Sequence, residues 1–367
     1  MPKLFIDTER LRDLNSGLGQ VCLNLGHELV RQCASQHANW ELTFLVPSGQ
    51  AGIFGDARSG VPVSYVEASW LRKFYMPGRY DVWHCLHQDS AYLPGAGQGK
   101  LLLTIHDLNF LNRLDYSDAK KDRKRQDMQR RVDQATGLTA ISNATANDVR
   151  ANLRVDDKPL TVIYNGVATD PAQASDDPDA DVLKPLAEPS AQPYFLFVGV
   201  IHPKKNVHTL LPLLEAFPDY RLVVAGPNDH PYARHISEQA ESLGILDRLI
   251  MPGSVSENDK LWLYAHCDAF LFPSLSEGFG LPVVEAMRFG KPVFLSTLTS
   301  LPEIGGKEAY YFQDFEPESM AKTLHDGLHD FPQNTLRQER QLRRASEFTW
   351  TKAAEAFWML YQKMASK

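Results

Sequence analysis

Short apolar runs alternate with helix-like stretches along almost the whole chain, and this alternation constrains the fold more than any other feature of the sequence. Runs at residues 3–6, 42–46 and 101–105 have the length and composition of buried strands. Residues 21–31 carry valine and leucine side chains at the spacing of one helical face. Strands that alternate with helices in this order predict parallel sheets with crossover helices, which is an α/β fold.

The alternation occurs twice, and a stretch of different composition separates the two occurrences. Residues 168–193 are rich in aspartate and proline and poor in aliphatic side chains, as expected for a connection between domains. Strand-like runs resume at 194–198 and continue to 292–295, and residues 351–364 predict an amphipathic terminal helix. Because a chain of 367 residues is too long for one ordinary core, two α/β domains are predicted.

Charge and cysteine content argue against several classes of protein. The net charge of −7 is unlike that of a general nucleic-acid-binding protein, which is usually basic. The four cysteines are scattered, so the sequence predicts neither a zinc site nor a disulfide framework, and a cytoplasmic location is expected. Charged residues interrupt the first apolar run, and no apolar stretch reaches the roughly 18 residues of a membrane span, which argues against a signal peptide and a spanning helix.

The segment most specific for chemistry joins a predicted strand to a helix that begins near Pro282. Gly278 and Gly280 in the connecting loop allow the backbone to approach a ligand, and the helix N-terminus behind them favours an anion such as a diphosphate. Glu277 lies in the loop and Glu285 lies in the helix, so both carboxylates can face one ligand. The competing interpretation is an ordinary strand–loop–helix junction with exposed acids.

Residues 277–287 read EGFGLPVVEAM, and this segment resembles the E-x7-E signature of glycosyltransferase family 4 almost letter for letter. The resemblance implies a GT-B fold, in which two Rossmann-like domains face each other across a cleft, and a reaction that retains the configuration of the transferred sugar. It places Glu277 beside the donor sugar and Glu285 on the nucleotide ribose. The loop residues expected to hold sugar hydroxyl groups are Phe279, Gly280 and Leu281.

A second loop carries two adjacent cations. Residues 197–206 read FVGVIHPKKN, so Lys204 and Lys205 follow the first strand of the second half, where doubly wound sheets bind ligands. Positive charge there would stabilise a leaving diphosphate, although paired lysines are more often solvated surface residues. The segment is similar to the family's VGR-xxx-(R/K)-K pattern, which implies that Gly199 lies at the donor site and that Lys205 binds the diphosphate. Val200 replaces the arginine of many members, so diphosphate contact must depend on Lys205 with help from Lys204.

The first half offers two less specific candidates. Gly17 and Gly19 precede a predicted helix in a segment that lacks the third glycine of a dinucleotide fingerprint. This segment resembles the family's glycine-rich loop that faces the diphosphate and the acceptor, and a plain helix-entry loop is the alternative. His106 follows a buried strand and matches the family histidine that contacts the donor sugar, although a lone histidine there is more often structural. Asp107 would orient His106 or hold the next loop.

Two further segments have both a functional and an ordinary interpretation. Residues 252–256 resemble a family loop near the nucleotide base, which makes Val255 a donor-site candidate, but taken alone they form an ordinary strand-end turn.

Residues 118–133 contain seven basic side chains interleaved with acids. A solvated helix face explains that pattern, and the alternative is a surface that contacts the inner membrane or a lipid-diphosphate acceptor.

The resemblance covers nearly the whole chain and sets the expected domain limits. Residues 1–170 form the acceptor-side Rossmann-like domain, and 171–192 form the linker. Residues 193–348 form the domain that binds the nucleotide sugar. Residues 349–367 form a terminal helix that crosses back to the first domain.

The expected reaction is hexose transfer from a nucleoside-diphosphate sugar to a bacterial surface glycan or its lipid-linked precursor. The Pro-Lys-Lys-Asn form of the lysine loop is similar to that of bacterial polysaccharide mannosyltransferases, so GDP-mannose is the expected donor. No paired aspartates stand at a strand end, so no metal site is expected, and no cofactor besides the donor co-substrate.

Two alternatives remain open, namely a GT-B sugar-nucleotide epimerase and a non-catalytic relative that binds a sugar nucleotide. An NAD-dependent oxidoreductase would need a GxGxxG loop after a strand, which is missing. A two-domain periplasmic binding protein would need a signal sequence and would lack the glutamate pair.

Overall fold

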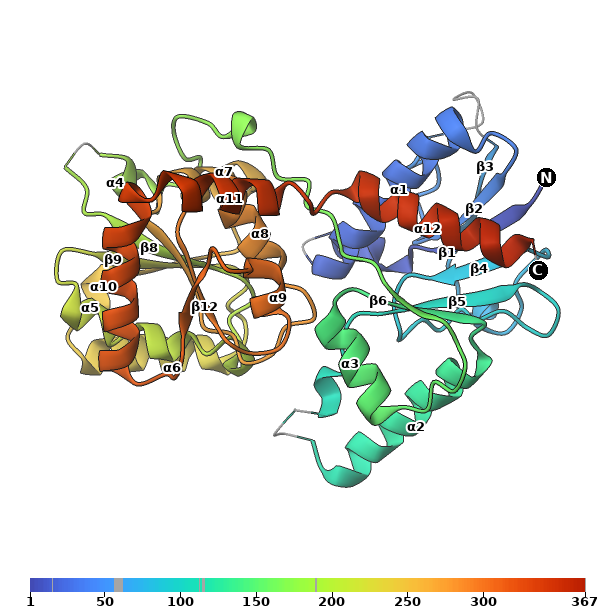
Figure 1. Cartoon of the computed structure of the whole chain (residues 1–367), viewed down its shortest axis with the longest axis horizontal. Helices are drawn as coiled ribbons and strands as arrows, with labels where there is room; N and C mark the ends of the chain where they lie inside the picture. The colour runs from blue at the N-terminus through green and yellow to red at the C-terminus, as the bar shows by residue number, and fades with distance from the viewer. Residues whose placement is uncertain (15, 56–61, 112, 114–115, 189, 367) are drawn as a thin grey trace. The chain divides into compact units, whose positions relative to one another are not determined.

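The computed structural model describes residues 1–366 except 15, 56–61, 112, 114–115 and 189. The chain divides into two compact units. Unit 1 comprises Met1–Ala168 and Phe348–Lys367, and unit 2 comprises Thr169–Glu347. Figure 1 shows a sheet with flanking helices in each unit.

The sheet of unit 1 is entirely parallel among its described strands, in the order β3-β2-β1-β4-β5-β6-β7. The strands are β1 (Lys3–Asp7), β2 (Glu41–Val46), β3 (Val63–Glu67), β4 (Val82–Cys85), β5 (Lys100–Ile105), β6 (Gly137–Ala140) and β7 (Leu160–Val162). The α-helices are α1 (Gly17–Gln36), α2 (Asp118–Gln134), α3 (Asn143–Asn152) and α12 (Trp350–Ala365).

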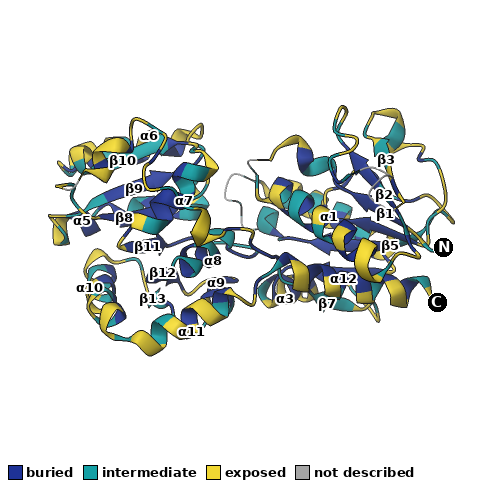
Figure 2. Cartoon of the chain, turned by 90° about the horizontal axis from the view of Figure 1, so that it is seen from above, coloured by how far each residue is buried: buried dark blue, intermediate teal, exposed yellow. Residues whose placement is uncertain are grey.

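Each face of this sheet has its own hydrophobic core. Leu4 and Ile6 of β1 pack in one core with residues of α1 and α12. Phe5, which lies between them, packs in the other core with Met128 and Val132 of α2. The alternation follows from the two-residue period of a strand, and Figure 2 shows the strands buried and the outer faces of the helices exposed.

The terminal helix α12 packs on the first half of the chain, beside α1 (Figure 1). The Trp358 ring stacks on His37 with centroids 4.3 Å apart, and Gln32 Nε2 donates to the carbonyl oxygen of Thr351 over 2.9 Å. The hydroxyl of Tyr361 lies 2.7 Å from Nδ1 of His84. Residues from both ends of the sequence therefore form one core.

The sheet of unit 2 is also parallel, in the order β10-β9-β8-β11-β12-β13 among its described strands. The strands are β8 (Tyr194–Val198), β9 (Arg221–Ala225), β10 (Leu249–Gly253), β11 (Ala269–Phe272), β12 (Val293–Ser296) and β13 (Tyr310–Phe312). The α-helices are α4 (Lys184–Ala187), α5 (Leu213–Ala216), α6 (Pro231–Ser242), α7 (Glu257–His266), α8 (Leu281–Arg288), α9 (Leu301–Gly305), α10 (Pro317–Gln333) and α11 (Thr335–Ala345). Two parallel sheets with crossover helices confirm the predicted α/β fold of two Rossmann-like domains.

The acidic stretch interpreted as a linker is grouped with unit 2 in the structure. Asp259 Oδ1 accepts from the backbone N–H groups of Asp179 and Ala180 over 2.7 and 3.1 Å. The Trp262 indole donates to the carbonyl oxygen of Asp176 over 3.1 Å. These bonds hold much of 171–192 against α7. Across the described part of the chain, no helix combines the length and apolar character needed to cross a bilayer.

Candidate active site

The candidate site lies where the winding of unit 2 changes direction, between the adjacent strands β8 and β11. Loops that follow two such strands diverge and leave room for a ligand beyond the strand ends. Lys205 ends the short turn Pro203–Lys205 after β8, and Glu277 lies in the loop after β11. The topology therefore brings together two residues that the sequence analysis took from separate motifs.

Lys205 and Glu277 form an ion pair there. Nζ of Lys205 donates to Oε1 of Glu277, and 12% of the lysine and 11% of the glutamate side chain stay exposed. Ser274 Oγ donates to the same carboxylate oxygen over 2.6 Å, and the ammonium lies 4.9 Å from the centre of the Phe272 ring. Burial lowers the pKa of Lys205, and the Glu277 charge opposes that shift. Because the ammonium has three donors, it can serve a phosphate oxygen as well as Glu277.

A turn after β12 fixes the backbone around Glu277. Thr299 has a φ of 53°, in the left-handed region that β-branched residues rarely adopt. Its Oγ1 accepts from the Glu277 N–H over 3.0 Å. Ser300 Oγ lies 3.1 and 2.9 Å from the carbonyl oxygens of Glu277 and Phe279. The strain at Thr299 accompanies a contact that positions a candidate site residue, and no residue pattern around Thr299 predicts it.

Lys204 connects the two loops through its backbone. Its carbonyl oxygen accepts from the N–H of Leu275 over 2.8 Å and lies 3.2 Å from Ser274 Oγ. Its ammonium is close enough to contribute to the lowered pKa of Lys205. Lys204 is thus a second cation beside the pair as well as part of the scaffold.

Gly199 lies where the loops after β8 and β9 approach each other. A Cβ atom placed on Gly226 would lie 2.2 Å from the carbonyl oxygen of Gly199. Gly199 itself has a φ of 152°, and its N–H donates to Ala225 over 2.9 Å. This packing of backbone against backbone explains both glycines without a ligand.

Gly280 leads directly into α8, with a φ of 104° that only glycine adopts readily. A Cβ atom there would also lie 3.1 Å from Leu301 Cδ2. Leu281 begins the helix, and the Phe279 ring is buried in the core of the unit. The three predicted loop residues therefore stand at a helix N-terminus, which favours anions through its partial positive charge.

Glu285 belongs to a separate cluster on α8 and does not contact the Lys205–Glu277 pair. Its Oε2 accepts from the hydroxyl of Tyr264 over 2.8 Å. Its Oε1 accepts from Thr169 Oγ1 over 3.2 Å and from Lys260 Nζ over 3.3 Å. Burial disfavours the Lys260 ammonium, yet the neighbouring carboxylates raise its pKa overall. The sequence analysis missed Lys260 and Tyr264, whose spacing of four on α7 was the available signal.

Val255 stands apart from both clusters. It is half-buried in the loop between β10 and α7. Strand β10 is at the edge of the sheet, and β9 separates it from β8. The structure thus places Val255 at the carboxyl end of the sheet but two strands away from the Lys205 loop.

In unit 1, the sequence predicted that Gly17 and Gly19 precede a helix. In the structure both glycines belong to the first turn of α1. Helix α1 begins at Gly17, and Ser16 Oγ accepts from the N–H of Gly19 over 3.1 Å. A Cβ atom on Gly19 would lie 2.0 Å from the carbonyl oxygen of Asp13. Close backbone packing overrides the low helix propensity of glycine.

His106 follows β5 and is buried. Its Nε2 lies 2.7 Å from the carbonyl oxygen of Leu86, so this nitrogen carries the proton. Its backbone N–H donates to Gln88 Oε1 over 3.0 Å. Burial lowers the pKa of His106, which keeps the ring neutral.

A buried polar group at the β1–β4 junction was missed by the sequence analysis. Asp7 accepts from the hydroxyl of Ser90, and burial raises the pKa of Asp7 to about 6. His87 Nε2 lies 3.8 Å from Asp7 Oδ2, and neither ring nitrogen of His87 has a hydrogen-bond partner among the described residues. Burial lowers the pKa of His87 to about 2, and that of His84 to about 3.

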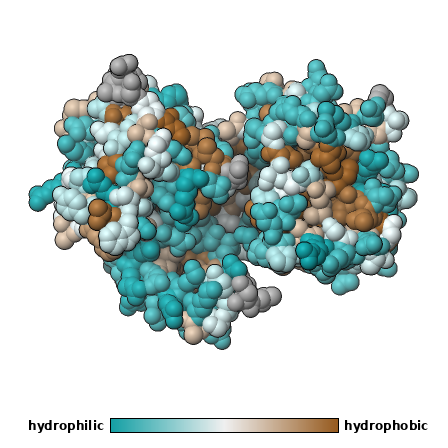
Figure 3. All heavy atoms as spheres, turned by 180° about the vertical axis from the view of Figure 1, so that it is seen from behind, coloured by the Kyte–Doolittle hydropathy of each residue, from teal (hydrophilic) through white to brown (hydrophobic). Residues whose placement is uncertain are grey.

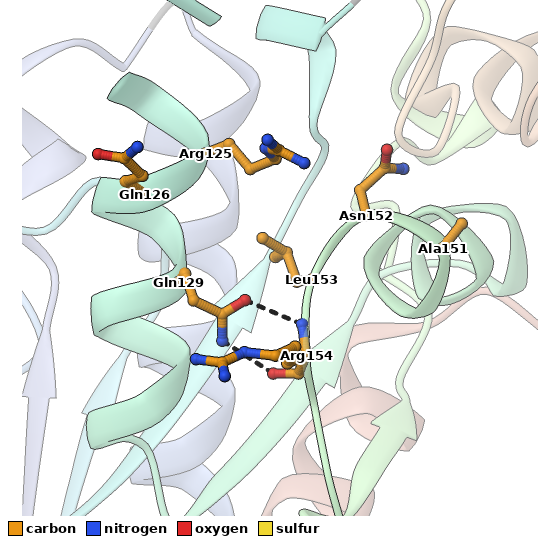
Figure 4. Close-up of a pocket in the computed structure, with 7 residues that line it drawn as sticks. All are labelled: Arg125, Gln126, Gln129, Ala151, Asn152, Leu153 and Arg154. Atoms are coloured by element: carbon orange, nitrogen blue, oxygen red, sulfur yellow. Dashed lines mark hydrogen bonds between the residues drawn. The ribbon is translucent and has the colours of Figure 1, made fainter. Parts of the chain in front are cut away.

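A shallow hollow of about 390 Å³ between α2 and α3 lies elsewhere in unit 1 (Figure 4). Gln129 crosses it and exchanges two hydrogen bonds with the backbone of Arg154. It contains none of the predicted site residues. In the described residues, no three His, Cys, Asp or Glu side chains are grouped to hold a metal ion.

Two family models together match most of the chain. Residues 16–171 match "Glycosyltransferase Family 4", and residues 180–346 match "Glycosyl transferases group 1". The chain belongs to the glycosyltransferases, with a family 4 domain followed by a group 1 domain. The second match contains Lys205, Glu277 and Glu285, and the first contains Gly17, Gly19 and His106.

Curated proteins similar to this chain include bacterial mannosyltransferases. The serotype-specific mannosyltransferase WbdA of Escherichia coli is 29% identical over 230 residues, which is 60% of this chain and 28% of WbdA. The O-antigen chain mannosyltransferase B of Escherichia coli is 28% identical over 279 residues, 72% of this chain and 70% of the relative. The chain thus spans little more than a quarter of WbdA.

Solved structures support the GT-B fold. The sucrose-phosphate synthase of Thermosynechococcus elongatus superposes with a TM-score of 0.74 at 18% identity, over 100% of both chains. Anabaena HepE in complex with UDP and glucose superposes with a TM-score of 0.70 at 18% identity, over 99% of both chains. At this identity the likeness concerns the fold alone.

Proposed function

We propose that this glycosyltransferase moves mannose from GDP-mannose to a surface glycan or its lipid-linked precursor, with retention of configuration at the anomeric carbon. The mannosyltransferase relatives and the form of the lysine loop support the donor. The ion pair of Lys205 and Glu277 at the β8–β11 junction is the observation that carries the proposal. The reaction is expected in the cytoplasm.

The pair suits a donor that has a diphosphate next to a sugar. Lys205, with Lys204 beside it, would contact the diphosphate, and the N-terminus of α8 would add partial positive charge. Glu277 would accept hydrogen bonds from hydroxyl groups of the sugar, because Ser274 already holds its carboxylate and Thr299 holds its backbone N–H.

In the proposed step, the bond between the anomeric carbon and the diphosphate oxygen breaks, and its electron pair stays on the diphosphate. The acceptor hydroxyl oxygen forms the new bond on the same face of the sugar, and its proton passes to the departing phosphate. Lys205 stabilises the charge that develops there, and it does so more strongly in the transition state than in the ground state. No divalent metal is needed for this charge stabilisation.

Glu285 would bind the ribose. Its Oε2 accepts one hydrogen bond, from Tyr264, and its Oε1 accepts two, from Lys260 and Thr169. The carboxylate therefore keeps lone pairs for hydrogen bonds from ribose hydroxyl groups. Lys260 would then lie close to the same part of the nucleotide.

A donor panel tests the proposal. GDP-mannose, GDP-glucose, UDP-glucose and ADP-glucose are each supplied with a lipid-linked glycan acceptor, and the product is analysed by NMR. The proposal expects mannosylated product with the α-configuration of the donor and full activity in excess EDTA. Transfer from a different donor, a β-linked product or strict rescue by Mg²⁺ would contradict the corresponding part.

The two open alternatives give different results in the same assay. An epimerase would convert the sugar nucleotide without acceptor. A non-catalytic relative would bind GDP-mannose and release no GDP, with or without acceptor.

A further inference from the structure

A short segment of unit 1 presents four large apolar side chains to solvent. Phe74 is 76% exposed, Tyr75 71%, Trp70 69% and Leu71 68%. These are the four highest values among the large apolar side chains of the described residues, and we refer to residues 70–75 as the aromatic tip. Figure 3 shows apolar patches within a mostly hydrophilic surface on the face that it presents.

The aromatic tip is held by well-formed local structure. It follows β3 and contains the turn Leu71–Lys73, and the N–H groups of Phe74 and Tyr75 both bond the carbonyl oxygen of Leu71 over 3.1 Å. On one side Ala68 packs against the core, and on the other side Met76 is 3% exposed within it. The chain is therefore anchored at both ends of the tip, while the four large apolar side chains between the anchors are exposed.

The tip also carries local positive charge. Residues 68–80 contain Arg72, Lys73 and Arg79 and no acidic residue, a charge of +3 in a chain whose net charge is −7. None of these three cations forms an ion pair with a carboxylate that the structure describes. Uncompensated cations beside exposed aromatic rings are typical of proteins that bind anionic lipid surfaces.

Helix α2 presents no exposed large apolar side chain among its described residues, although the sequence made it the candidate for membrane contact. Two of its cations pair with acids on the same helix, Arg125 with Asp122 and Arg130 with Asp127. Its buried apolar side chains, Met128 among them, face the core that it shares with Met76. The interpretation of α2 as a solvated helix face is thus favoured, and Ala68 and Met76, which flank the tip, belong to the same core.

We propose that the aromatic tip docks this protein on the surface of an anionic lipid bilayer. Trp70 and Phe74 would enter the boundary between headgroups and acyl chains, and Arg72 and Lys73 would contact lipid phosphates. A neutral glycan would use aromatic faces but would not require the cations or the aliphatic Leu71. A second copy of the chain would bring two positive patches together, which is unfavourable.

Trp70 provides a specific optical probe of docking. The chain has six tryptophans, and the other five are buried, namely Trp40, Trp83, Trp262, Trp350 and Trp358. With vesicles of phosphatidylglycerol and phosphatidylcholine, we expect Trp70 emission to shift to the blue and to be quenched by brominated acyl chains. Pure phosphatidylcholine vesicles should give a much weaker effect, and high salt should reverse binding. This measurement requires neither donor nor acceptor, so its outcome is independent of the proposed function.

Matched variants separate the tip from other surfaces. Trp70→Ser/Phe74→Ser and Arg72→Ala/Lys73→Ala should each lower vesicle partitioning roughly tenfold or more. Lys121→Ala/Arg123→Ala on α2, which removes the same charge, and Leu336→Ser, which removes an exposed apolar side chain in unit 2, should change it less than about twofold. Equal loss in the α2 variant would overturn the proposal. It would also be overturned if the wild type did not bind at low salt, or if the tip variants instead dissolved a dimer or lost glycan binding.

Discussion

The two units place different chemistry at the same topological position. In unit 2 the junction of β8 and β11 holds Lys205 and Glu277, a charged pair with its side chains partly open to water. In unit 1 the junction of β1 and β4 holds the buried residues Asp7 and His87. Burial raises the pKa of Asp7 and lowers the pKa of His87, and both changes favour the neutral form of the side chain. The β8–β11 junction thus keeps charge available for an anionic ligand. The β1–β4 junction contains buried titratable groups, which make the free energy of unfolding depend on pH.

The largest difference between the units should appear on acidification. Unit 1 buries neutral His84 and His87, whose folded-state pKa values of about 3 and 2 lie below the unfolded value of 6.5. The unfolded chain therefore binds more protons, and stability is lost as pH falls from 6.5 toward 3. By pH 4.5 each histidine should cost about 3 kcal/mol.

Hydrogen exchange measured by mass spectrometry between pH 7 and 4.5, corrected for intrinsic rates, should show that unit 1 opens before unit 2. His87→Leu should retain more of its stability at pH 4.5, because it removes one titrating group whose nitrogens have no described hydrogen-bond partner. If both units open at the same pH, or if His87→Leu does not change the dependence of exchange on pH, the buried histidines do not make unit 1 the more acid-sensitive unit.

The second prediction concerns catalysis in unit 2. Lys205→Ala should lower kcat roughly 100- to 1,000-fold, since removal of one preorganised charge contact costs about 3 to 4 kcal/mol of barrier. Lys204→Ala is the matched control and should lower kcat far less, because the backbone contacts of residue 204 to Leu275 and Ser274 survive the substitution. Steady-state kinetics with the confirmed donor measures both. Equal losses would show that Lys205 has no special role.

The third prediction separates the two glutamates. Glu285→Gln should weaken GDP binding about tenfold, because a ribose contact acts in ground and transition states alike. Glu277→Gln should bind GDP nearly as well as the wild type but turn over more slowly, because its proposed partner is the sugar. Calorimetry with GDP alone gives the answer, and equal affinity losses would contradict the assignment.

The smallest effect is expected from Asp7. Its folded-state pKa of about 6 lies above the unfolded value of 3.8, so the folded state binds more protons between these values and Asp7 costs stability as pH rises through 6. Between pH 5 and 7 this cost is about 1 kcal/mol. Relative to Asp7→Asn, the wild type should therefore gain that amount on acidification from pH 7 to 5. Urea unfolding at both pH values measures the difference, and a constant difference would contradict the burial of a titrating Asp7.

The sequence predicted the fold class because alternating strand and helix patterns are local. Lys205 and Glu277 were each predicted from a strand-end motif and from resemblance to glycosyltransferase family 4, and their ion pair was not predicted. The sequence did not predict the features that depend on long-range contacts. The conformation of Thr299 is tied to its bond with the Glu277 backbone, and the spacing of Asp7 and His87 gives no sign that they meet. The acidic stretch 171–192 resembled a linker because its bonds to Asp259 and Trp262 join residues about 80 positions apart.

We propose that unit 2 binds the donor nucleotide through the loops after β8 and β11. Backbone hydrogen exchange of the full chain with and without saturating GDP tests it most directly. We predict protection at residues 199–206 and 275–288, with little change at residues 7–19 and 86–90 of unit 1. Protection confined to those unit 1 segments, with the unit 2 loops unchanged, would contradict the account.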